Sequence, residues 1–212
     1  MSPRLTRAEQ AERNRALLLA AARRVFLKRG YHGASVEQIA DEAGFSTGVV
    51  YSQFGGKADL FFALLDARIT ERAAGNTQAA EGLTGDEGVA RLLENAAVVD
   101  RAEPEWGLLV VEFRVHAVRD PELARRYAVA HQRTLAGAER LVAGLYQRAG
   151  EQPPLPPADL ARLLVAIDTG ARLEEAAAPG SSPMTLLAGL ITHLIAHKRA
   201  GAVAAPGREG IR

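Results

Sequence analysis

The stretch that decides the fold is SVEQIADEAGFSTGVVYSQFGGK, residues Ser35 to Lys57. Ser35 is a favourable N-cap, and Gln38 stands three residues later, which together form the capping-box pattern of a helix start. Apolar residues then recur at helical spacing, and Gly44 stands where a helix end favours a left-handed residue. Ser46 offers a second N-cap and opens a second short helical segment. The stretch therefore predicts two short helices joined by a tight turn, which is a helix-turn-helix.

A helix-turn-helix commonly places its second helix in the major groove of DNA. The alternative is a purely structural corner between two helices, which can carry the same glycine. The chain before the motif favours DNA binding, because residues 1–30 hold eight basic residues and two acidic ones. Such charge beside a helix-turn-helix is expected of a phosphate-binding surface, although the same arginines could only solubilise an exposed helix face.

The longer segment GYHGASVEQIADEAGFSTGVVYSQFGGKADLF resembles the DNA-binding domain of TetR-family transcriptional regulators. The resemblance covers Phe26 to Leu65, and the remainder is similar to that family only in its length and all-helical character. It implies a dimeric repressor that binds a palindromic operator in double-stranded DNA and releases it when a small-molecule effector binds. The aromatic residues Trp106, Phe113 and Tyr127 predict that this effector is mostly hydrophobic.

The first turn of the second helix is the part that reaches base edges. Thr47 can bond a base and offer its methyl group to thymine, while Gly48 allows a close approach of the backbone. The resemblance adds Glu37 to the base contacts, and it implies phosphate contacts for Tyr51, Gln53 and Lys57. Tyr51 could equally be a partly buried hydrophobic anchor. Because the residues at the start of this helix are small, we expect thin direct readout and a larger contribution from DNA shape. The full predicted DNA-binding set is Ser35, Glu37, Ser46, Thr47, Gly48, Val49, Tyr51, Gln53 and Lys57.

The composition describes a globular protein of one or two domains, with 212 residues, 48% of them hydrophobic, and a net charge of +1. Cysteine is absent, which excludes disulfides and thiolate zinc sites and suits a reducing cytoplasm. The longest uninterrupted apolar run has 7 residues, against about 18 for a membrane-spanning helix. The first 15 residues lack the apolar core of a signal peptide. We therefore expect a cytoplasmic protein that makes no membrane contact.

The rest of the chain predicts an all-α fold of about nine helices, because helical periodicity recurs between glycine- and proline-rich breaks. The first helix is expected from about Glu12 to Arg29, after a flexible polar arm. The predicted domains are residues 1–56 for DNA binding, residues 57–200 for effector binding and dimerisation, and a disordered tail over residues 201–212.

Aromatic and histidine side chains in the larger domain form a candidate effector site with apolar walls and a few polar groups. They could equally belong to a filled core. As a catalytic set they fail, because Glu112 and His116 are spaced ExxxH rather than ExxH, and HExxH does not occur. We therefore expect no enzyme activity, no metal and no cofactor. The predicted ligand-binding residues are Trp106, Phe113, His116, Tyr127 and His131.

The last two helices carry apolar stripes that could pair with a second copy of the chain. The TetR resemblance implies a four-helix dimer interface there, whereas the stripes alone also fit an ordinary intramolecular core. Gly170 and Gly189 lie within these helices, where a glycine costs about 1 kcal/mol relative to alanine and so calls for a packing reason. The predicted interface is Leu160, Leu164, Ile167, Ala171, Leu187, Ile191 and Leu194.

Two other functions fit the same sequence. One is an architectural DNA-binding protein that responds to no effector, which a fully packed larger domain would favour. The other is a helical enzyme with an auxiliary helix-turn-helix, which would keep its turnover after DNA binding is lost.

Overall fold

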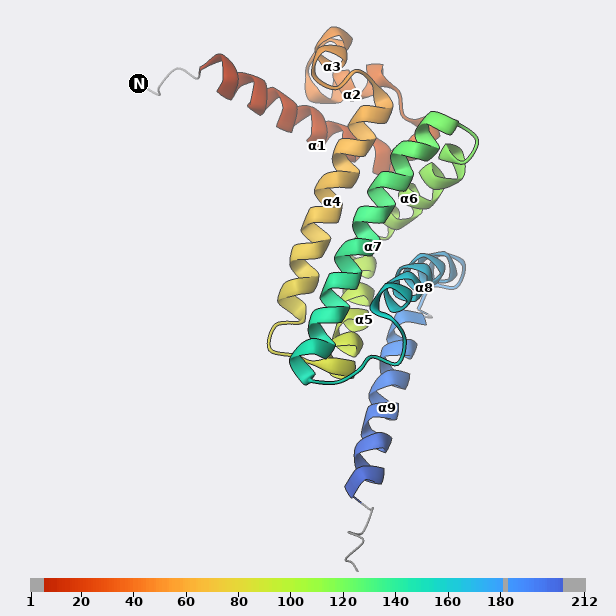
Figure 1. Cartoon of the computed structure of the whole chain (residues 1–212). Coiled ribbons are helices and arrows are strands. Elements are labelled where there is room, and N and C mark those ends of the chain that lie inside the picture. The colour runs from red at the N-terminus through yellow and green to blue at the C-terminus, as the bar shows by residue number, and fades with distance from the viewer. Residues whose placement is uncertain (1–5, 181–182, 204–212) are drawn as a thin grey trace, which may run out of the picture. The chain divides into compact units, whose positions relative to one another are not determined.

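The computed structural model describes residues 6–180 and 183–203, and within this part of the chain the secondary structure is entirely helical (Figure 1). The all-α prediction is confirmed. The helices are α1 (Arg7–Gly33), α2 (Val36–Ala43), α3 (Thr47–Phe54), α4 (Lys57–Ala79), α5 (Gly85–Ala102), α6 (Pro104–Ala117), α7 (Pro121–Ala149), α8 (Pro157–Ala177) and α9 (Pro183–Val203).

The first helix begins at Arg7, earlier than the start predicted near Glu12. Thr6 is its N-cap: the Thr6 hydroxyl accepts from the backbone N–H of Glu9 at 3.2 Å, and the Glu9 carboxylate accepts the Thr6 N–H at 2.7 Å. This capping box satisfies two donors that a helix start otherwise leaves unpaired. The prediction of a non-helical arm up to residue 12 is therefore wrong for residues 7–12.

The helix-turn-helix forms from the caps that the sequence indicates. Ser35 and Gln38 make a reciprocal capping box, with distances of 3.3 Å and 3.2 Å. Gly44 ends α2 in the left-handed region at φ 73°, and its N–H donates to the carbonyls of Ala40 and Asp41. A side chain at Gly44 would strain this turn, because only glycine adopts that conformation without steric cost. α3 then starts after Ser46, whose side chain makes no capping bond.

The chain divides into two compact units. The first combines Met1–Arg72 with Glu105–Arg133, and the second combines Ala73–Pro104 with Thr134–Arg212, each within its described residues. The DNA-binding helices therefore share a unit with the beginning of α4, with α6 and with the beginning of α7. This grouping is larger than the predicted domain of residues 1–56.

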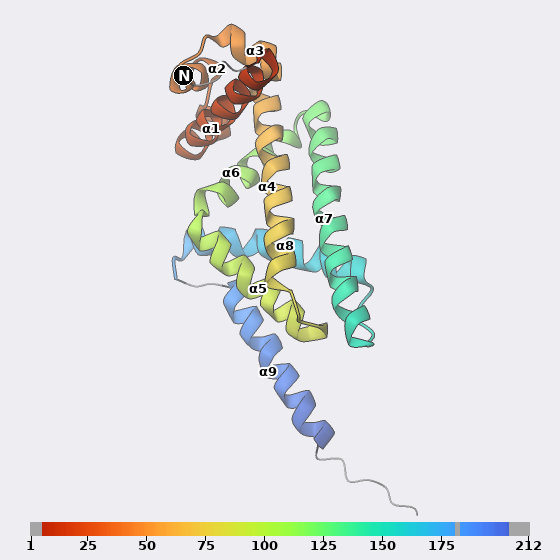
Figure 2. The same ribbon diagram turned by 90° about the vertical axis from the view of Figure 1, so that its left-hand side faces the viewer.

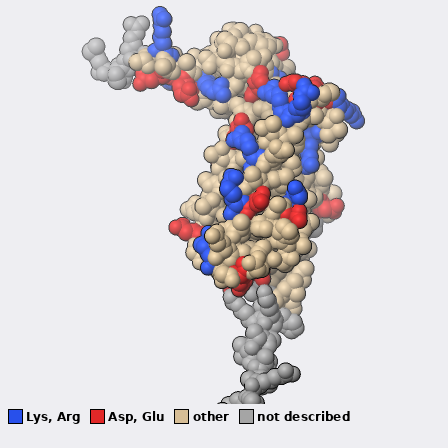
Figure 3. All heavy atoms as spheres, in the orientation of Figure 1, with Lys and Arg blue, Asp and Glu red and all other residues tan. Residues whose placement is uncertain are grey.

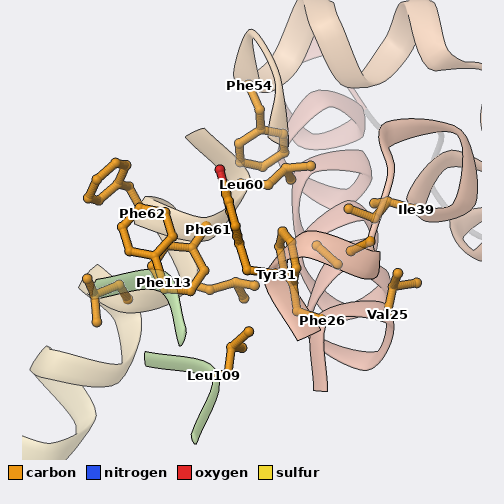
Figure 4. Close-up of a cluster of buried hydrophobic side chains, with 14 of the residues drawn as sticks. Val25, Phe26, Tyr31, Ile39, Phe54, Leu60, Phe61, Phe62, Leu109 and Phe113 are labelled. Carbon is orange, nitrogen blue, oxygen red and sulfur yellow. The ribbon is translucent and has the colours of Figure 1, made fainter. Parts of the chain in front are cut away.

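An aromatic cluster explains why the first unit reaches as far as α6 (Figure 4). Phe61 of α4 stacks on Phe113 of α6 with ring centroids 3.9 Å apart. Tyr31, near the end of α1, meets the Phe113 ring edge-on at 4.7 Å and the Phe61 ring at 5.5 Å. Aromatic pairs at such separations add to the stability that burial of their area provides.

Two ion pairs join α4 to α7 inside the first unit. Asp59 pairs with Arg126 and Asp66 pairs with Arg133, each at 2.6 Å. The partners are seven residues apart on both helices, so these parts of α4 and α7 run side by side in the same direction (Figures 1 and 2). Each pair is partly exposed and adds little stability by itself, but together the two pairs specify one register between the helices.

The second unit is built on α5, which packs against α9 and α8. Its core holds small and aliphatic side chains around Leu93 and Leu145. The Tyr146 hydroxyl of α7 donates to the Asp86 carboxylate of α5, and burial raises the pKa of Tyr146. No helix in the described ranges has the length and apolar character to span a membrane.

Gly88 provides a test of the packing between α5 and α7. An added Cβ would lie 2.3 Å from Cδ2 of Leu145, which is fully buried. Gly88→Ala should therefore lower the free energy of unfolding by about 1–3 kcal/mol through overpacking. The matched control is Gly75→Ala in α4, where no described heavy atom lies within 4 Å. Alanine there should raise stability by up to about 1 kcal/mol. Urea denaturation measures both, and equal effects of the two changes would contradict this packing.

Candidate functional site

The exposed side chains of α3 are mostly small, and none of its residues carries a charge. Val50 and Phe54 are buried and fix the inner face of the helix, while Gly48 and Ser46 are exposed. The Tyr51 side chain is 54% exposed, which is more than a hydrophobic anchor would show and leaves its hydroxyl accessible. In Figure 3 the surface over α3 carries no blue or red atoms on the face shown. The exposed groups are thus suited to close contact with a duplex, and charge attraction must come from neighbouring elements.

The N-terminus of α2 contributes two of the predicted DNA-binding residues. The Ser35 hydroxyl already accepts the Gln38 N–H. Glu37 is exposed, and hydrogen bonds from its own backbone and from Ser35 hold the pKa of its carboxyl below the ordinary value. An ionised carboxylate at this place repels phosphate but can accept a hydrogen bond from the amino group of cytosine.

The remaining recognition-helix residues, Thr47, Val49 and Gln53, are half-buried. The Gln53 carbonyl accepts from Nη1 of Arg15 at 3.2 Å, and the Arg15 guanidinium lies 4.2 Å above the Phe54 ring. Arg15 thereby holds the end of α3 against α1. In the sequence, this arginine is recognisable only as one of the eight basic residues among residues 1–30. Its place one turn before the buried stripe of α1 is the signal that could have identified its packing role.

Lys57 points into the protein rather than away from it. Its Nζ donates to the carbonyl of Tyr31 at 2.9 Å and to the carbonyl of Ala34 at 3.0 Å, and it lies 4.5 Å from the centre of the Tyr31 ring. Burial lowers the pKa of Lys57, and the nearby Glu112 carboxylate raises it in part. Of its three donors two are used inside the chain, so the predicted phosphate contact stays a prediction with one donor available.

The five predicted ligand-binding residues all lie in the first unit, on α6 and α7. Phe113 has no exposed surface and Trp106 is 6% exposed. His116 is half-buried and faces His32 of α1, with ring centroids 4.5 Å apart. Phe113 therefore acts as a core residue here. Its role in ligand binding stays a prediction, as do those of Trp106 and His116.

Tyr127 and His131 form a separate pair on α7. Their rings stack with centroids 6.1 Å apart, and the Arg114 guanidinium lies 6.0 Å from the Tyr127 ring. Burial lowers the pKa of His131 and Arg114 lowers it further, which keeps this imidazole neutral at pH 7. Burial likewise raises the pKa of Tyr127. Neutral rings beside a guanidinium could fix the polar end of a ligand. Among the described residues no group of three histidines or acids is arranged to hold a metal ion.

The predicted dimer stripes pack mainly inside the second unit. Six of the seven residues lie in or against its core, and only Leu194 is exposed. Apart from Leu194, the leucines that face outward lie outside the predicted stripes, because these apolar helices carry more than one helical stripe. Gly170 and Gly189 are also exposed, and no heavy atom of the described chain lies within 4 Å of a Cβ added at either. The exposed leucines of α8 and α9 are Leu163, Leu173, Leu186, Leu190 and Leu194.

Comparisons with known proteins agree with this geometry. Residues 18–64 match the family described as bacterial regulatory proteins, tetR family, and residues 86–199 match the C-terminal domain of BetI-type transcriptional repressors. The HTH-type transcriptional activator FasR of Mycolicibacterium smegmatis is 33% identical over 119 residues, which are 56% of this chain and 54% of FasR. The HTH-type transcriptional repressor AcnR of Corynebacterium efficiens is 32% identical over 58% of this chain and 61% of AcnR. The chain thus spans little more than half the length of these relatives.

Solved structures show the same fold over most of the chain. GusR of Salmonella enterica superposes with a TM-score of 0.65 at 25% identity, covering 91% of this chain and 98% of GusR. FadR of Bacillus subtilis, solved in complex with stearoyl-CoA, has a TM-score of 0.69 at 16% identity, covering 85% of this chain and 96% of FadR. The likeness to FadR is one of fold alone.

The position of Lys57 leads to a testable expectation. Lys57→Ala leaves the carbonyls of Tyr31 and Ala34 without their donor. It should lower the free energy of unfolding by about 1–3 kcal/mol. The exposed Lys28 of α1 is the control, and its alanine variant should stay within about 0.5 kcal/mol of the parent. The salt dependence of DNA binding separates the two roles, because loss of a phosphate contact lowers its slope by about one. Unchanged stability together with a lower slope would contradict the internal role.

Proposed function

We propose a function for this chain, which belongs to the TetR family of transcriptional regulators: as a homodimer it binds a palindromic operator and releases it when a small, mostly hydrophobic effector binds. The helix-turn-helix carries the proposal. Its turn is set by Gly44, and the start of α3 exposes small side chains that allow a close approach to base edges. We propose that the nine residues named above, between Ser35 and Lys57, contact the operator. The protein then acts in the cytoplasm, where the operator DNA lies.

Dimerisation is supported by the outward leucines of α8 and α9. Leu186 is 71% exposed and Leu190 is 54% exposed, with Leu194 one turn further along the same face. Contiguous apolar surface of this kind marks a protein–protein interface. The open surroundings of Gly170 and Gly189 would let helices of a second copy approach closely. Two copies related by a two-fold axis read half-sites whose centres are about 34–36 Å apart, or a multiple of that distance.

The effector proposal rests on the side chains of α6 and α7 and on energetics. A 100-fold release of DNA needs about 2.7 kcal/mol of coupling between the two sites. Burial of one side-chain-sized apolar group supplies about 1.5–3 kcal/mol. FadR, which shares the fold, is described with stearoyl-CoA bound, so this architecture holds an amphipathic ligand in that protein. Repression is favoured by the match to BetI-type repressors and by the name of AcnR, although FasR is named an activator.

A second candidate is an architectural DNA-binding protein that responds to no effector. The observation that favours it is the complete burial of Phe113 among the aromatic rings of α1 and α4. Such a protein would bind its operator equally well whatever small molecule is added. An enzyme with an auxiliary helix-turn-helix has less support, because the matched relatives are named as transcriptional regulators.

Selection from a random duplex library tests the DNA-binding function. We expect enrichment of a palindrome, which the protein then binds more tightly than random duplex at the same salt concentration. Thr47→Ala should change the preferred base at one position of each half-site, since a good contact to a base is worth about 1–3 kcal/mol of discrimination. Thr70→Ala on α4 is the control and should select the parental sequence. Equal affinity of the wild type for selected and random duplex would refute the function.

The oligomeric state tests the role of the exposed leucines. Leu190→Glu should give monomers at micromolar concentration and weaken operator binding, because an ionised carboxylate on each copy would have to be buried in the interface. Leu155→Glu is the matched control: Leu155 is 43% exposed but lies in the segment between α7 and α8. Light scattering of the purified proteins measures both. A dimeric Leu190→Glu variant would place the interface elsewhere.

A further inference from the structure

The segment Gly30–Ala34 connects the long part of α1 to the helix-turn-helix; we call it the connector. Gly30 interrupts α1 with φ 69° and ψ 176°, so that Tyr31 begins a new helical turn. Ala34 is followed directly by Ser35, the N-cap of α2. A displacement of the connector is therefore passed to α2 over a few residues of chain.

A side chain from α6 holds the N–H groups of the connector. The Glu112 Oε2 atom accepts from the N–H of Tyr31 at 3.0 Å, and Oε1 accepts from the N–H of His32 at 2.9 Å. Both oxygens of one carboxylate are thus engaged by consecutive amides at the start of a helical turn. Negative charge is favoured at such a place, and hydrogen bonds to an ionised acceptor are stronger than neutral ones.

Lys57 holds the carbonyl groups of the same connector from α4, at Tyr31 and at Ala34. The backbone of Tyr31 is therefore fixed on both sides, its N–H by α6 and its C=O by α4. The ring contacts follow the same pairing, because Tyr31 packs on Phe113 and His32 faces His116. Three side chains of α6, those of Glu112, Phe113 and His116, thus contact the same two residues of the connector.

Gly30 fits the carboxylate as well as the backbone. A Cβ at this position would lie 2.5 Å from Oε2 of Glu112, well inside van der Waals contact. The positive φ of Gly30 independently disfavours a side chain. The absence of a side chain at residue 30 therefore leaves the space that the Glu112 carboxylate occupies.

We propose that Glu112 is a positioning residue for operator binding: by holding the amides of Tyr31 and His32, it fixes the helix-turn-helix to α6. The inference rests on the proposed function, because it concerns how a dimer presents its two recognition helices. α6 follows α5 in the chain, so any movement of α6 is passed through Glu112 to the residues just before α2. The spacing of the two recognition helices then depends on this contact, whereas the fit of a single helix in its groove does not.

The test compares Glu112→Gln with the wild type on the palindrome that the wild type selects and on a duplex with one half-site. A glutamine amide can accept with one oxygen only, so one of the two connector amides loses its partner. We expect binding to the palindrome to weaken about tenfold, the size of one lost charge-assisted hydrogen bond. Binding to the half-site should change by less than about twofold. Hydrogen exchange should become faster at the amides of residues 31 and 32, while the protein stays dimeric. Glu122→Gln on α7, whose carboxylate pairs with Arg125, is the control and should bind both duplexes as the wild type does.

Gly30→Ala approaches the same contact from the other side. In the wild-type background it should weaken binding to the palindrome about as much as Glu112→Gln does, because the added Cβ displaces the carboxylate. In a Glu112→Ala background the clash is absent, so the same change should cost markedly less, which a double-mutant cycle measures. Gly33→Ala, where the nearest atom is at 3.5 Å, is the control glycine.

Several outcomes would overturn the inference. Equal weakening on palindrome and half-site would show that Glu112 only stabilises the fold. Wild-type affinity and unchanged exchange in Glu112→Gln, or additive effects in the cycle, would show that the contact has no positioning role. If the wild type selects no palindrome at all, the proposed function fails instead, and that result is visible before any variant is made.

Discussion

Burial of one tyrosine ring is the constraint on which the first unit depends. Tyr31 is only 4% exposed, although it stands near the end of a helix where the chain turns. Its ring lies among Phe26, Phe61 and Phe113, which come from three different helices. Burial raises the pKa of Tyr31, so the ring stays neutral throughout the physiological range. The ring thus contacts side chains of α1, α4 and α6 at once, next to the residues that lead into the two short DNA-binding helices.

The sequence predicted the helix-turn-helix well because its determinants are local. Ser35, Gln38 and Gly44 act on backbone groups within four residues of themselves, so the printed order of residues is enough to place both helix ends. The same rule applied to Thr6 and Glu9 would have given the correct start of α1. The residues that the prediction missed act over long separations. Glu112 meets residues about 80 positions away, and Lys57 turns back to α1, and neither pattern leaves a periodic trace.

The dimer interface on α8 and α9 stays a prediction for a related reason. These helices are apolar on more than one side, so the stripe that meets α5 and the stripe that meets solvent look alike in the sequence. Only the packing shows that Ile167 and Leu187 lie against the core while Leu186 and Leu190 face outward. The aromatic residues of α6 raised the same question, and Phe113 resolves as core. The basic charge of α1 does not lie wholly free for DNA, because Arg15 contacts α3 and Arg24 pairs with Glu42 of α2.

The paired charges on α4 and α7 limit how the first unit can move. Their spacing of seven residues corresponds to about 10.5 Å along each helix, whereas one helical turn is about 5.4 Å. A slide of α7 along α4 by one turn would separate both Asp59 from Arg126 and Asp66 from Arg133 and would bring no new pair into register. Rocking of the two helices about the line between the pairs keeps both intact. The two helices can therefore change their tilt together, whereas sliding along each other would break both ion pairs.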